Sequence, residues 1–333
     1  MANIVTAQQL IAEPRNLQPH VVLLGAGASK ATFMDGDRNG RPIPVMEDLI
    51  EITGLRTVLD KARIDLTKES NFEVIYSNLA QNPELQSTAR EIENQIDAYF
   101  SSLALPETAT IYDRLLLSLR PADAVFTFNW DPFLFDAYQR NRSVASLPGM
   151  YFLHGNVRVG ICCNHSDRWG EKYLACPDCA EPLVPVPLLF PLSQKNYSHP
   201  YIRQSWESAR KLLRSAFTIT IFGYGAPTAD QDAVALLRKA WFSESDRKIE
   251  HVQIIDTACA TTLHQRWATF TPSGHYRIAR NFSESRIARW PRRTCESLIY
   301  PMTEGRPCED FPLPETERLE FLQKEAARIA TFE

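Results

Sequence analysis

The stretch His20–Ser29, with the sequence HVVLLGAGAS, decides the fold class of this 333-residue chain. Its first half is a short apolar run with two valines, and its second half consists mainly of glycine and alanine. An apolar run followed directly by glycines is typical of a buried strand that meets a tight turn. The turn is either purely structural or a place where backbone amides approach a phosphate group. Lys30 stands where a full dinucleotide fingerprint would have its third glycine.

Outward from this strand, other apolar segments also end in polar or glycine residues. They cover residues 122–128, 150–153, 216–222 and, as the last strand, 251–255; the residues after them are Asn129–Asp131, His154–Gly155, Gly223–Asp230 and Asp256. Helical periodicity dominates residues 46–117, 200–214 and 314–332. Strands that alternate with helices predict an α/β fold with a Rossmann-like parallel sheet, and such sheets bind ligands at the carboxyl ends of their strands.

The same pattern predicts how the chain is divided. We expect a Rossmann-like domain in residues 1–160 and 184–270, with a helical insertion at 46–118. Residues 161–183 would form a small zinc-binding module, and residues 271–333 a mostly helical C-terminal extension.

Charge and hydropathy exclude several classes of protein. The chain has 36 Lys and Arg against 40 Asp and Glu, a net charge of −4, so the molecule as a whole does not attract nucleic acid. No apolar run approaches the ~20 residues that a membrane helix needs, and the N-terminus lacks the pattern of a signal peptide. We therefore expect a cytoplasmic protein without a membrane partner, in a compartment that keeps cysteines reduced.

Four of the seven cysteines lie within residues 162–179, and their spacing predicts a metal site. Cys176 and Cys179 are separated by two residues, as in a zinc knuckle, and Cys162 and His165 have the same spacing. We predict these four as ligands of a structural Zn²⁺, with Cys163 in reserve because adjacent cysteines rarely both bind one ion. A group of reduced, buried thiols is the alternative.

Two further patterns allow both a structural and a functional interpretation. Asn129 and Asp131 either form a turn or present an amide and a carboxylate at the sheet edge, and His154 is a candidate general base. The six arginines within residues 277–293 form either a solvated helical face or a patch for phosphate or a partner.

In their order along the chain, these motifs resemble the sirtuin family, and most closely its divergent bacterial sirtuin-like branch. The motifs are Gly25–Ser29, Thr127-x-Asn129-x-Asp131, His154-Gly155, the cysteine knuckles, and Gly223-Tyr224-Gly225 with Asp230. The resemblance covers residues 21–256 and implies a Rossmann-like NAD⁺-binding domain with inserted zinc and helical modules.

The resemblance also implies roles for individual residues in cleavage of the nicotinamide–ribose bond of NAD⁺. Asn129 would lie beside the nicotinamide ribose, Asp131 would contact the carboxamide, and His154 would be the general base. The remaining cofactor contacts would be Gly25, Ala26, Gly27 and Ser29 at the pyrophosphate, Gly223 and Tyr224 on the adenosine side, and Thr127, Asp230 and Asp256.

Two departures from the family decide which activity we expect. Sirtuin deacylases carry Gln where this chain has Phe128, and they carry a Phe-Gly-Glu stretch that residues 182–191 lack. Because these features serve the acyl-lysine peptide, their absence favours water as the acceptor and predicts an NAD⁺ glycohydrolase. An NAD-dependent protein deacylase or ADP-ribosyltransferase is the first alternative, and a non-catalytic NAD⁺ or ADP-ribose sensor is the second.

The resemblance finally implies a biological setting. Members of this bacterial branch act in antiphage defence by depleting NAD⁺. Such an activity must be restrained, so we expect a homo-oligomer or an operon-encoded protein partner that gates it, and we do not expect nucleic acid as a partner.

Overall fold

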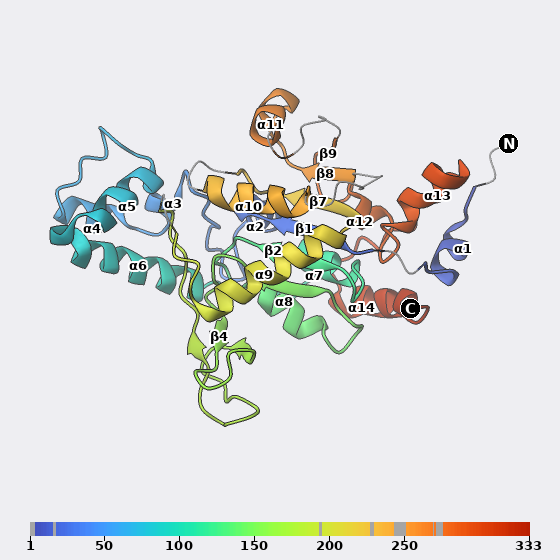
Figure 1. Cartoon of the computed structure of the whole chain (residues 1–333), viewed down its shortest axis with the longest axis horizontal. Coiled ribbons are helices and arrows are strands. Elements are labelled where there is room, and N and C mark those ends of the chain that lie inside the picture. The colour runs from blue at the N-terminus through green and yellow to red at the C-terminus, as the bar shows by residue number, and fades with distance from the viewer. Residues whose placement is uncertain are drawn as a thin grey trace.

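The structure is a computed structural model that describes residues 4–15, 18–192, 195–226, 230–242, 251–268, 270 and 276–333. These residues form one six-stranded sheet with helices on its faces and a smaller three-stranded sheet (Figure 1). Every pairing within the larger sheet is parallel. The predicted α/β class with a Rossmann-like parallel sheet is therefore confirmed.

The larger sheet has the strand order β3-β2-β1-β7-β8-β9. Its strands are β1 (His20–Leu24), β2 (Ala124–Thr127), β3 (Gly149–Phe152), β7 (Thr218–Phe222), β8 (His251–Ile255) and β9 (Tyr276–Ala279). The chain builds outward from β1 in one direction and then outward from β7 in the other. The order therefore reverses between β1 and β7, and in doubly wound sheets the ligand crevice opens at such a point.

The sequence did not predict β9, which pairs with β8 and extends the sheet beyond residue 255. Tyr276–Ala279 has the sequence YRIA, and only Ala279 is buried. An edge strand needs to be apolar only where it meets the core, so its composition does not distinguish it from a loop.

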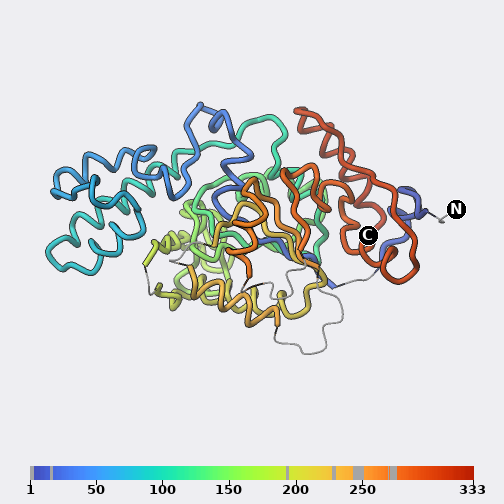
Figure 2. Tube along the Cα trace, turned by 90° about the horizontal axis from the view of Figure 1, so that it is seen from above, coloured from blue at the N-terminus to red at the C-terminus, as the bar shows by residue number. Residues whose placement is uncertain are grey.

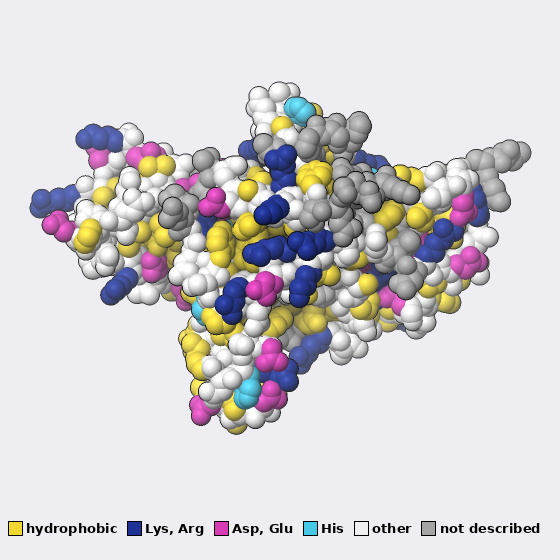
Figure 3. All heavy atoms as spheres, in the orientation of Figure 1, with side chains coloured by type: hydrophobic (Ala, Val, Ile, Leu, Met, Phe, Trp, Pro, Cys, Tyr) yellow, Lys and Arg dark blue, Asp and Glu magenta, His cyan; other side chains and the backbone are white. Residues whose placement is uncertain are grey.

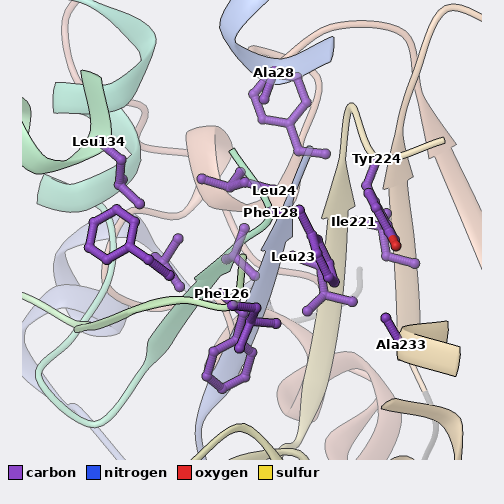
Figure 4. Close-up of a cluster of buried hydrophobic side chains, with 14 of the residues drawn as sticks. Leu23, Leu24, Ala28, Phe126, Phe128, Leu134, Ile221, Tyr224 and Ala233 are labelled. Atoms are coloured by element: carbon purple, nitrogen blue, oxygen red, sulfur yellow. The ribbon is translucent and has the colours of Figure 1, made fainter. Parts of the chain in front are cut away.

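The core lies around the central strands, because helices cover the sheet on both faces. All five residues of β1 and all five of β7 are buried. Figure 4 shows Leu23, Phe126 and Ile221, from three neighbouring strands, among the buried apolar side chains. Because these strands are apolar along their whole length, the parallel sheet could be predicted from the sequence.

Two pairs of helices pack against each other along the sheet. α9 (Pro200–Ser215) packs with α10 (Gln231–Trp241), and α7 (Ile111–Leu117) packs with α8 (Phe133–Asn141). In Figure 2, α9 and α10 run together along one side of the sheet (yellow to gold). The shorter helices α2 (Ala26–Thr32) and α11 (Ala260–Trp267) follow β1 and β8.

The segment between α2 and α7 is helical in the structure and projects to one side of the sheet (Figure 1). It contains α3 (Leu49–Ile52), α4 (Arg56–Lys61), α5 (Phe72–Gln81), the 3₁₀ helix η1 (Pro83–Leu85) and α6 (Gln86–Ser101). The domain boundaries proposed above remain predictions.

The smaller sheet protrudes at the bottom of the molecule in Figure 1, between the helical segment on the left and the C-terminal helices on the right. It is antiparallel, with the order β5-β4-β6, and consists of β4 (Val159–Ile161), β5 (Trp169–Glu171) and β6 (Val184–Pro185). In the part of the chain that the structure describes, no helix is both long and apolar enough to cross a bilayer.

The C-terminal region packs beside the N-terminal helix. It contains α12 (Arg286–Arg289), α13 (Glu296–Glu304) and α14 (Leu319–Ala330), and Val5, ahead of α1 (Ala7–Ala12), bridges to Cys308. This packing corrects both interpretations of the arginine run. Arg286, Arg292 and Arg293 are buried, so half of the run is neither a solvated face nor a surface patch.

Candidate functional site

A cavity of about 870 Å³ opens where the strand order reverses, at the carboxyl ends of the parallel strands. Ten of the predicted site residues line it: Gly25, Ala26, Gly27, Asn129, Asp131, His154, Gly223, Tyr224, Asp230 and Asp256. The other two, Ser29 and Thr127, are buried and lie outside the lining. Residues that are up to 231 positions apart in sequence, from Gly25 to Asp256, therefore line one cavity. They meet there because they follow the carboxyl ends of neighbouring parallel strands.

The glycines of the first turn are required by a close approach of two loops. A Cβ on Gly25 would lie 2.5 Å from Tyr224 Cα, and a Cβ on Gly223 would lie 2.1 Å from Ala28 N. The Gly27 amide donates to Gly223 O at 2.9 Å. The turn after β1 and the turn after β7 thus form one backbone floor under the cavity, which accounts for these glycines by packing alone.

The side-chain amide of Asn129 has one orientation because its neighbours define it. Its nitrogen Nδ2 lies 3.0 Å from Gly25 O, which only accepts hydrogen bonds, and 3.0 Å from Ser29 Oγ. The carboxamide oxygen Oδ1 therefore faces away from both groups. It is buried and has no hydrogen-bond partner among the described residues. An unpaired buried acceptor in a cavity wall is suited to bind a ligand hydroxyl or a water molecule.

Behind Asn129, Ser29 links Asp131 to Tyr112. The Ser29 hydroxyl donates to Asp131 Oδ2 at 2.6 Å, and Tyr112 Oη lies 2.7 Å from Ser29 Oγ. Since the single Ser29 hydrogen is used on Asp131, Tyr112 must donate to Ser29. Burial raises the pKa of Tyr112 well above 10, so its hydroxyl keeps the proton that this bond needs. Tyr112 lies on α7, outside every motif, and no pattern in the sequence marks it.

Asp131 is a buried carboxyl whose pKa is raised toward neutral pH. Burial raises the pKa of Asp131 to about 6, and the hydrogen bonds from Ser29 and from the Phe133 amide oppose that rise. The backbone carbonyl of Asp131 also accepts from Asn156 Nδ2 at 2.6 Å. The carboxyl is therefore held rigidly in the cavity wall and changes charge near physiological pH.

His154 lies between the aromatic ring of Phe128 and the ion pair that Asp230 forms with Lys195. The ring of Phe128 meets the His154 imidazole edge-on, with centroids 4.8 Å apart, and stacks on Tyr224 at 4.2 Å. Burial lowers the pKa of His154 to about 4, while the Asp230 carboxylate raises it and Lys195 lowers it. His154 is thus neutral at physiological pH, and its Nε2 has no hydrogen-bond partner in the described chain.

Asp230 holds the polar side of the cavity together. It accepts from Lys195 Nζ at 2.7 Å and from Tyr224 Oη at 3.0 Å, and its Oδ1 lies 4.0 Å from His154 Nε2. The sequence predicted Tyr224 and Asp230 but not Lys195, which lies in the Pro-rich connector before α9. Phe128 was noted only as a departure from a family pattern, and it is the residue that packs against His154.

The second predicted site, the cysteine cluster, forms a set of metal donors. Cys162, His165, Cys176 and Cys179 present donor atoms that all lie within 4.8 Å of one another. The Cys162 Sγ lies 3.5 Å from Cys179 Sγ and 3.6 Å from His165 Nδ1. Metal bonds of about 2.0–2.3 Å place tetrahedral ligands roughly 3.3–3.8 Å apart, so these donors fit Zn²⁺. Cys163 is exposed and is not one of the four.

The two sites differ in what they can do chemically. The four donors of the metal cluster face one another and would complete a tetrahedron, so a bound ion would hold β4 and β6 together and would have no open position. The cavity instead offers a neutral imidazole, an amide oxygen and a carboxyl, two of them with unpaired atoms. This arrangement can orient a hydroxyl or a water molecule and accept a proton from it.

Comparison with known proteins gives similar folds only. No family model matches the chain, and no curated protein matches it. Among solved structures, a Sir2 homologue mutant bound to ADP-ribose is 14% identical over 97% of this chain and 94% of its own, with a TM-score of 0.41. A Sir2 homologue bound to NAD is 14% identical over 97% and 93%, with a TM-score of 0.39. Because these TM-scores lie below 0.5, what the site does is decided by its own geometry.

Proposed function

We propose that the protein is an NAD⁺ glycohydrolase of the sirtuin-like type, which cleaves NAD⁺ with water to nicotinamide, ADP-ribose and a proton. The observation that carries the proposal is the pair of unpaired buried polar atoms, Asn129 Oδ1 and His154 Nε2, in one cavity at the strand-order reversal. The motif order described above supplies the substrate class, and the Rossmann strand order supplies the place for a dinucleotide.

The reaction asks for little general acid catalysis, because nicotinamide leaves as a neutral molecule. The C–N bond electrons go to the nicotinamide nitrogen, and the ribose becomes an oxocarbenium-like centre, as in glycoside hydrolysis. Asn129 Oδ1 would hold a ribose hydroxyl or the attacking water. His154 Nε2 would accept the proton that this water loses as its oxygen bonds to the ribose carbon.

The other cavity residues have supporting roles in the proposal. Ser29 and Tyr112 fix the orientation of Asn129 through the bonds described above. The backbone floor at Gly25–Gly27 and Gly223 would lie under the pyrophosphate, and Asp256, at the end of β8, is suited to accept from a ribose hydroxyl on the adenosine side. Burial excludes bulk water, which strengthens each of these interactions.

A bound Zn²⁺ would supply structure only. Cys162, His165, Cys176 and Cys179 would hold it, and their closed donor set leaves catalysis to the cavity.

The resemblance to the sirtuin-like branch, which suggests NAD⁺ as the substrate, also suggests a biological setting. We place the activity in antiphage defence by NAD⁺ depletion, restrained by self-association or by a protein partner. Sedimentation of the purified chain with and without NAD⁺ would show whether its assembly state changes with substrate.

The deciding experiment follows nicotinamide release from NAD⁺ without any peptide. We expect release, and we expect Asn129→Ala and His154→Ala each to lower kcat by roughly 10²–10⁴-fold. Asn39→Ala and His264→Ala, which remove the same side chains from exposed positions, should leave the rate unchanged.

Each other outcome identifies a different activity. Release that requires an acyl-lysine peptide would establish a deacylase, and ADP-ribose found attached to protein would establish a transferase. Binding of NAD⁺ without release would establish a sensor. Release that survives both cavity substitutions would show that Asn129 and His154 are not the catalytic residues.

A further inference from the structure

The outer face formed by α9 and α10 is strongly basic, although the chain as a whole carries a net charge of −4. The two helices carry six cationic residues, Arg203, Arg210, Lys211, Arg214, Arg238 and Lys239, and all six are exposed. Only two acidic residues, Glu207 and Asp232, lie on the same helices. Figure 3 shows the dark-blue side chains gathered over α9 and α10 in the centre of the visible face. We call this the basic face.

Five of the six cations of the basic face form no ion pair with a carboxylate of the described chain. No described carboxylate lies within 4.0 Å of Arg203, Arg210 or Lys211 on α9, or of Arg238 or Lys239 on α10. Exposed cations elsewhere are often paired, as Arg38 is with Glu107 and Arg168 with Asp178. Charges that the fold leaves unneutralised remain available to a ligand.

The spacing of these charges gives them a common direction. Arg203 and Arg210 are seven residues apart, which is close to two helical turns, so they project from the same side of α9. The stretch from Arg203 to Lys211 covers roughly 12 Å of the helix axis, and packed helix axes lie about 8–10 Å apart. α10 packs directly against α9 and adds Arg238 and Lys239 beside this row. Duplex DNA carries one phosphate charge per ~1.7 Å of its axis, so a surface of this size faces several phosphates.

The composition of the face favours a phosphate backbone over a protein. None of the exposed large apolar side chains in the described chain lies on α9 or α10. Protein interfaces are centred on buried aromatic or aliphatic anchors, whereas nucleic-acid interfaces are polar and cationic. Four of the six cations are arginines, whose planar guanidinium groups match phosphate oxygens in pairs.

We propose that the basic face of α9 and α10 binds the phosphate backbone of a nucleic-acid duplex, without reading its sequence. This function does not depend on the cavity or on the proposed NAD⁺ cleavage, since none of the six cations lines the cavity. It also revises the expectation drawn from net charge. Screening at physiological salt limits charge interactions to about 8 Å, so a local cluster acts on a polyanion that the whole molecule would not attract.

The test measures binding of the full-length protein to a short fluorescein-labelled DNA duplex by anisotropy, over a range of KCl concentrations. Neutralising about five phosphates gives a slope of roughly −4 to −5 in log K against log [KCl], a loss of affinity of about 500-fold between ~50 and ~200 mM. The triple variant Arg203→Gln, Arg210→Gln, Lys211→Gln should flatten that slope by about 2–3 and weaken binding at low salt by at least tenfold.

The matched control removes the same charge from a different surface. Lys61→Gln, Lys68→Gln, Arg90→Gln changes three exposed cations in the helical segment before α7 and should bind as the wild type does. Equal weakening by the two triple variants would show a general charge effect and overturn the proposal, as would the absence of binding at low salt. Preferential binding to phosphatidylserine vesicles over the duplex would also overturn it, in favour of a membrane surface. Unchanged circular dichroism of both variants excludes misfolding.

Discussion

Two polar clusters in this molecule, each built around buried side chains, differ in what they leave unpaired. The cavity cluster consists of Ser29, Tyr112, Asn129, Asp131 and His154, and the C-terminal arginine cluster consists of Arg292, Arg293 and Glu333. In the cavity cluster, Asn129 Oδ1 and His154 Nε2 have no partner among the described residues. In the arginine cluster, both guanidinium groups are bonded on every nitrogen.

The arginine cluster shows what a structural network looks like. Arg293 donates to the carbonyls of Leu10 and Ile11 at 3.0 and 2.8 Å and to Glu333 at 3.0 Å. Arg292 donates to Leu119 O at 2.9 Å and to Glu333 at 2.7 Å. These bonds join segments from both ends of the chain. Buried polar groups that satisfy one another stabilise a fold, whereas those that leave acceptors facing a cavity are available for a ligand.

The largest expected effect comes from the metal donors, which face one another as the arginine cluster does. Cys176→Ser removes one of four ligands, and we expect loss of bound zinc and proteolysis between β4 and β6, because little else is buried in that module. Cys163→Ser, an exposed neighbour, is the control and should keep about one zinc per chain. Metal analysis of freshly reduced protein measures both; equal zinc in the two variants would contradict the donor set.

Breaking the arginine cluster should cost stability without a specific loss of activity. Arg293→Leu leaves the buried carbonyls of Leu10 and Ile11 without their donor and leaves Glu333 with Arg292 alone, and we expect a loss of about 3–5 kcal/mol in the free energy of unfolding. Arg277→Leu, at an exposed position, should change it by less than about 0.5 kcal/mol. Urea unfolding gives both values. A near-neutral Arg293→Leu would mean that the cluster is not a structural network.

A substitution in the cavity cluster should instead lower activity strongly and stability only a little. Asn129→Ala should lower kcat by roughly 10²–10⁴-fold, because an acceptor in the wall of the proposed reaction site is lost. Stability should fall less than in Arg293→Leu, because Asn129→Ala removes only the neutral hydrogen bonds of Nδ2, whereas Arg293→Leu removes charge-assisted ones. Nicotinamide release and urea unfolding on the same preparation separate the two effects; a variant that loses stability as severely as Arg293→Leu would remove the distinction between the clusters.

The pH dependence of stability tests the buried carboxyl of the cavity cluster. The pKa of Asp131 is about 6 in the folded protein, against 3.8 ordinarily, so between these values the folded state binds a proton that the unfolded state has released. Stability from this group therefore falls as pH rises from 4 to 6, by about 3 kcal/mol in total. The pKa of His154, lowered to about 4 from 6.5, acts in the opposite direction over nearly the same window.

The single variant Asp131→Asn isolates this contribution, because His154 and the other buried histidines remain in both proteins. We expect the variant to gain stability relative to wild type as the pH rises from 4 to 7, by up to about 3 kcal/mol. Urea unfolding at several pH values measures the difference. A difference that stays constant with pH would show that Asp131 is ionised throughout.

The smallest effect should come from Tyr112, which acts on the reaction only through Ser29 and Asn129. Tyr112→Phe removes the hydrogen bond to Ser29 Oγ, worth about 1 kcal/mol, and the longer bond accepted from Asn129 Nδ2 at 3.3 Å, and we expect a several-fold lower kcat with little change in KM. Tyr76→Phe, which removes a hydroxyl bonded to Glu93 on α6, is the matched control. Equal effects of the two substitutions on kcat would show that Tyr112 does not act through Ser29 and Asn129.

The elements that could be predicted are those whose chemistry is local. The strand His20–Leu24 has the predicted bounds, and α9 differs from its prediction by one residue at its end, because a buried strand and an amphipathic helix each leave a periodic pattern. The metal donors were predictable because two ligands on one turn must be two or three residues apart. The edge strand β9 was not, because an edge needs few apolar residues, and Tyr112 was not, because a long-range hydrogen bond leaves no spacing in the sequence.

The sequence by itself determined the fold class, the strand ends that meet at the cavity and the four metal donors, since each depends on residues close together in the chain. Only the tertiary structure decided which polar groups are paired. It buried Arg292 and Arg293 against backbone carbonyls, turned the Asn129 amide so that its oxygen is free, and brought the cations of α9 and α10 onto one face. The physical reason is that pairing and exposure depend on which distant segments pack together, and charge or residue type alone does not specify that packing.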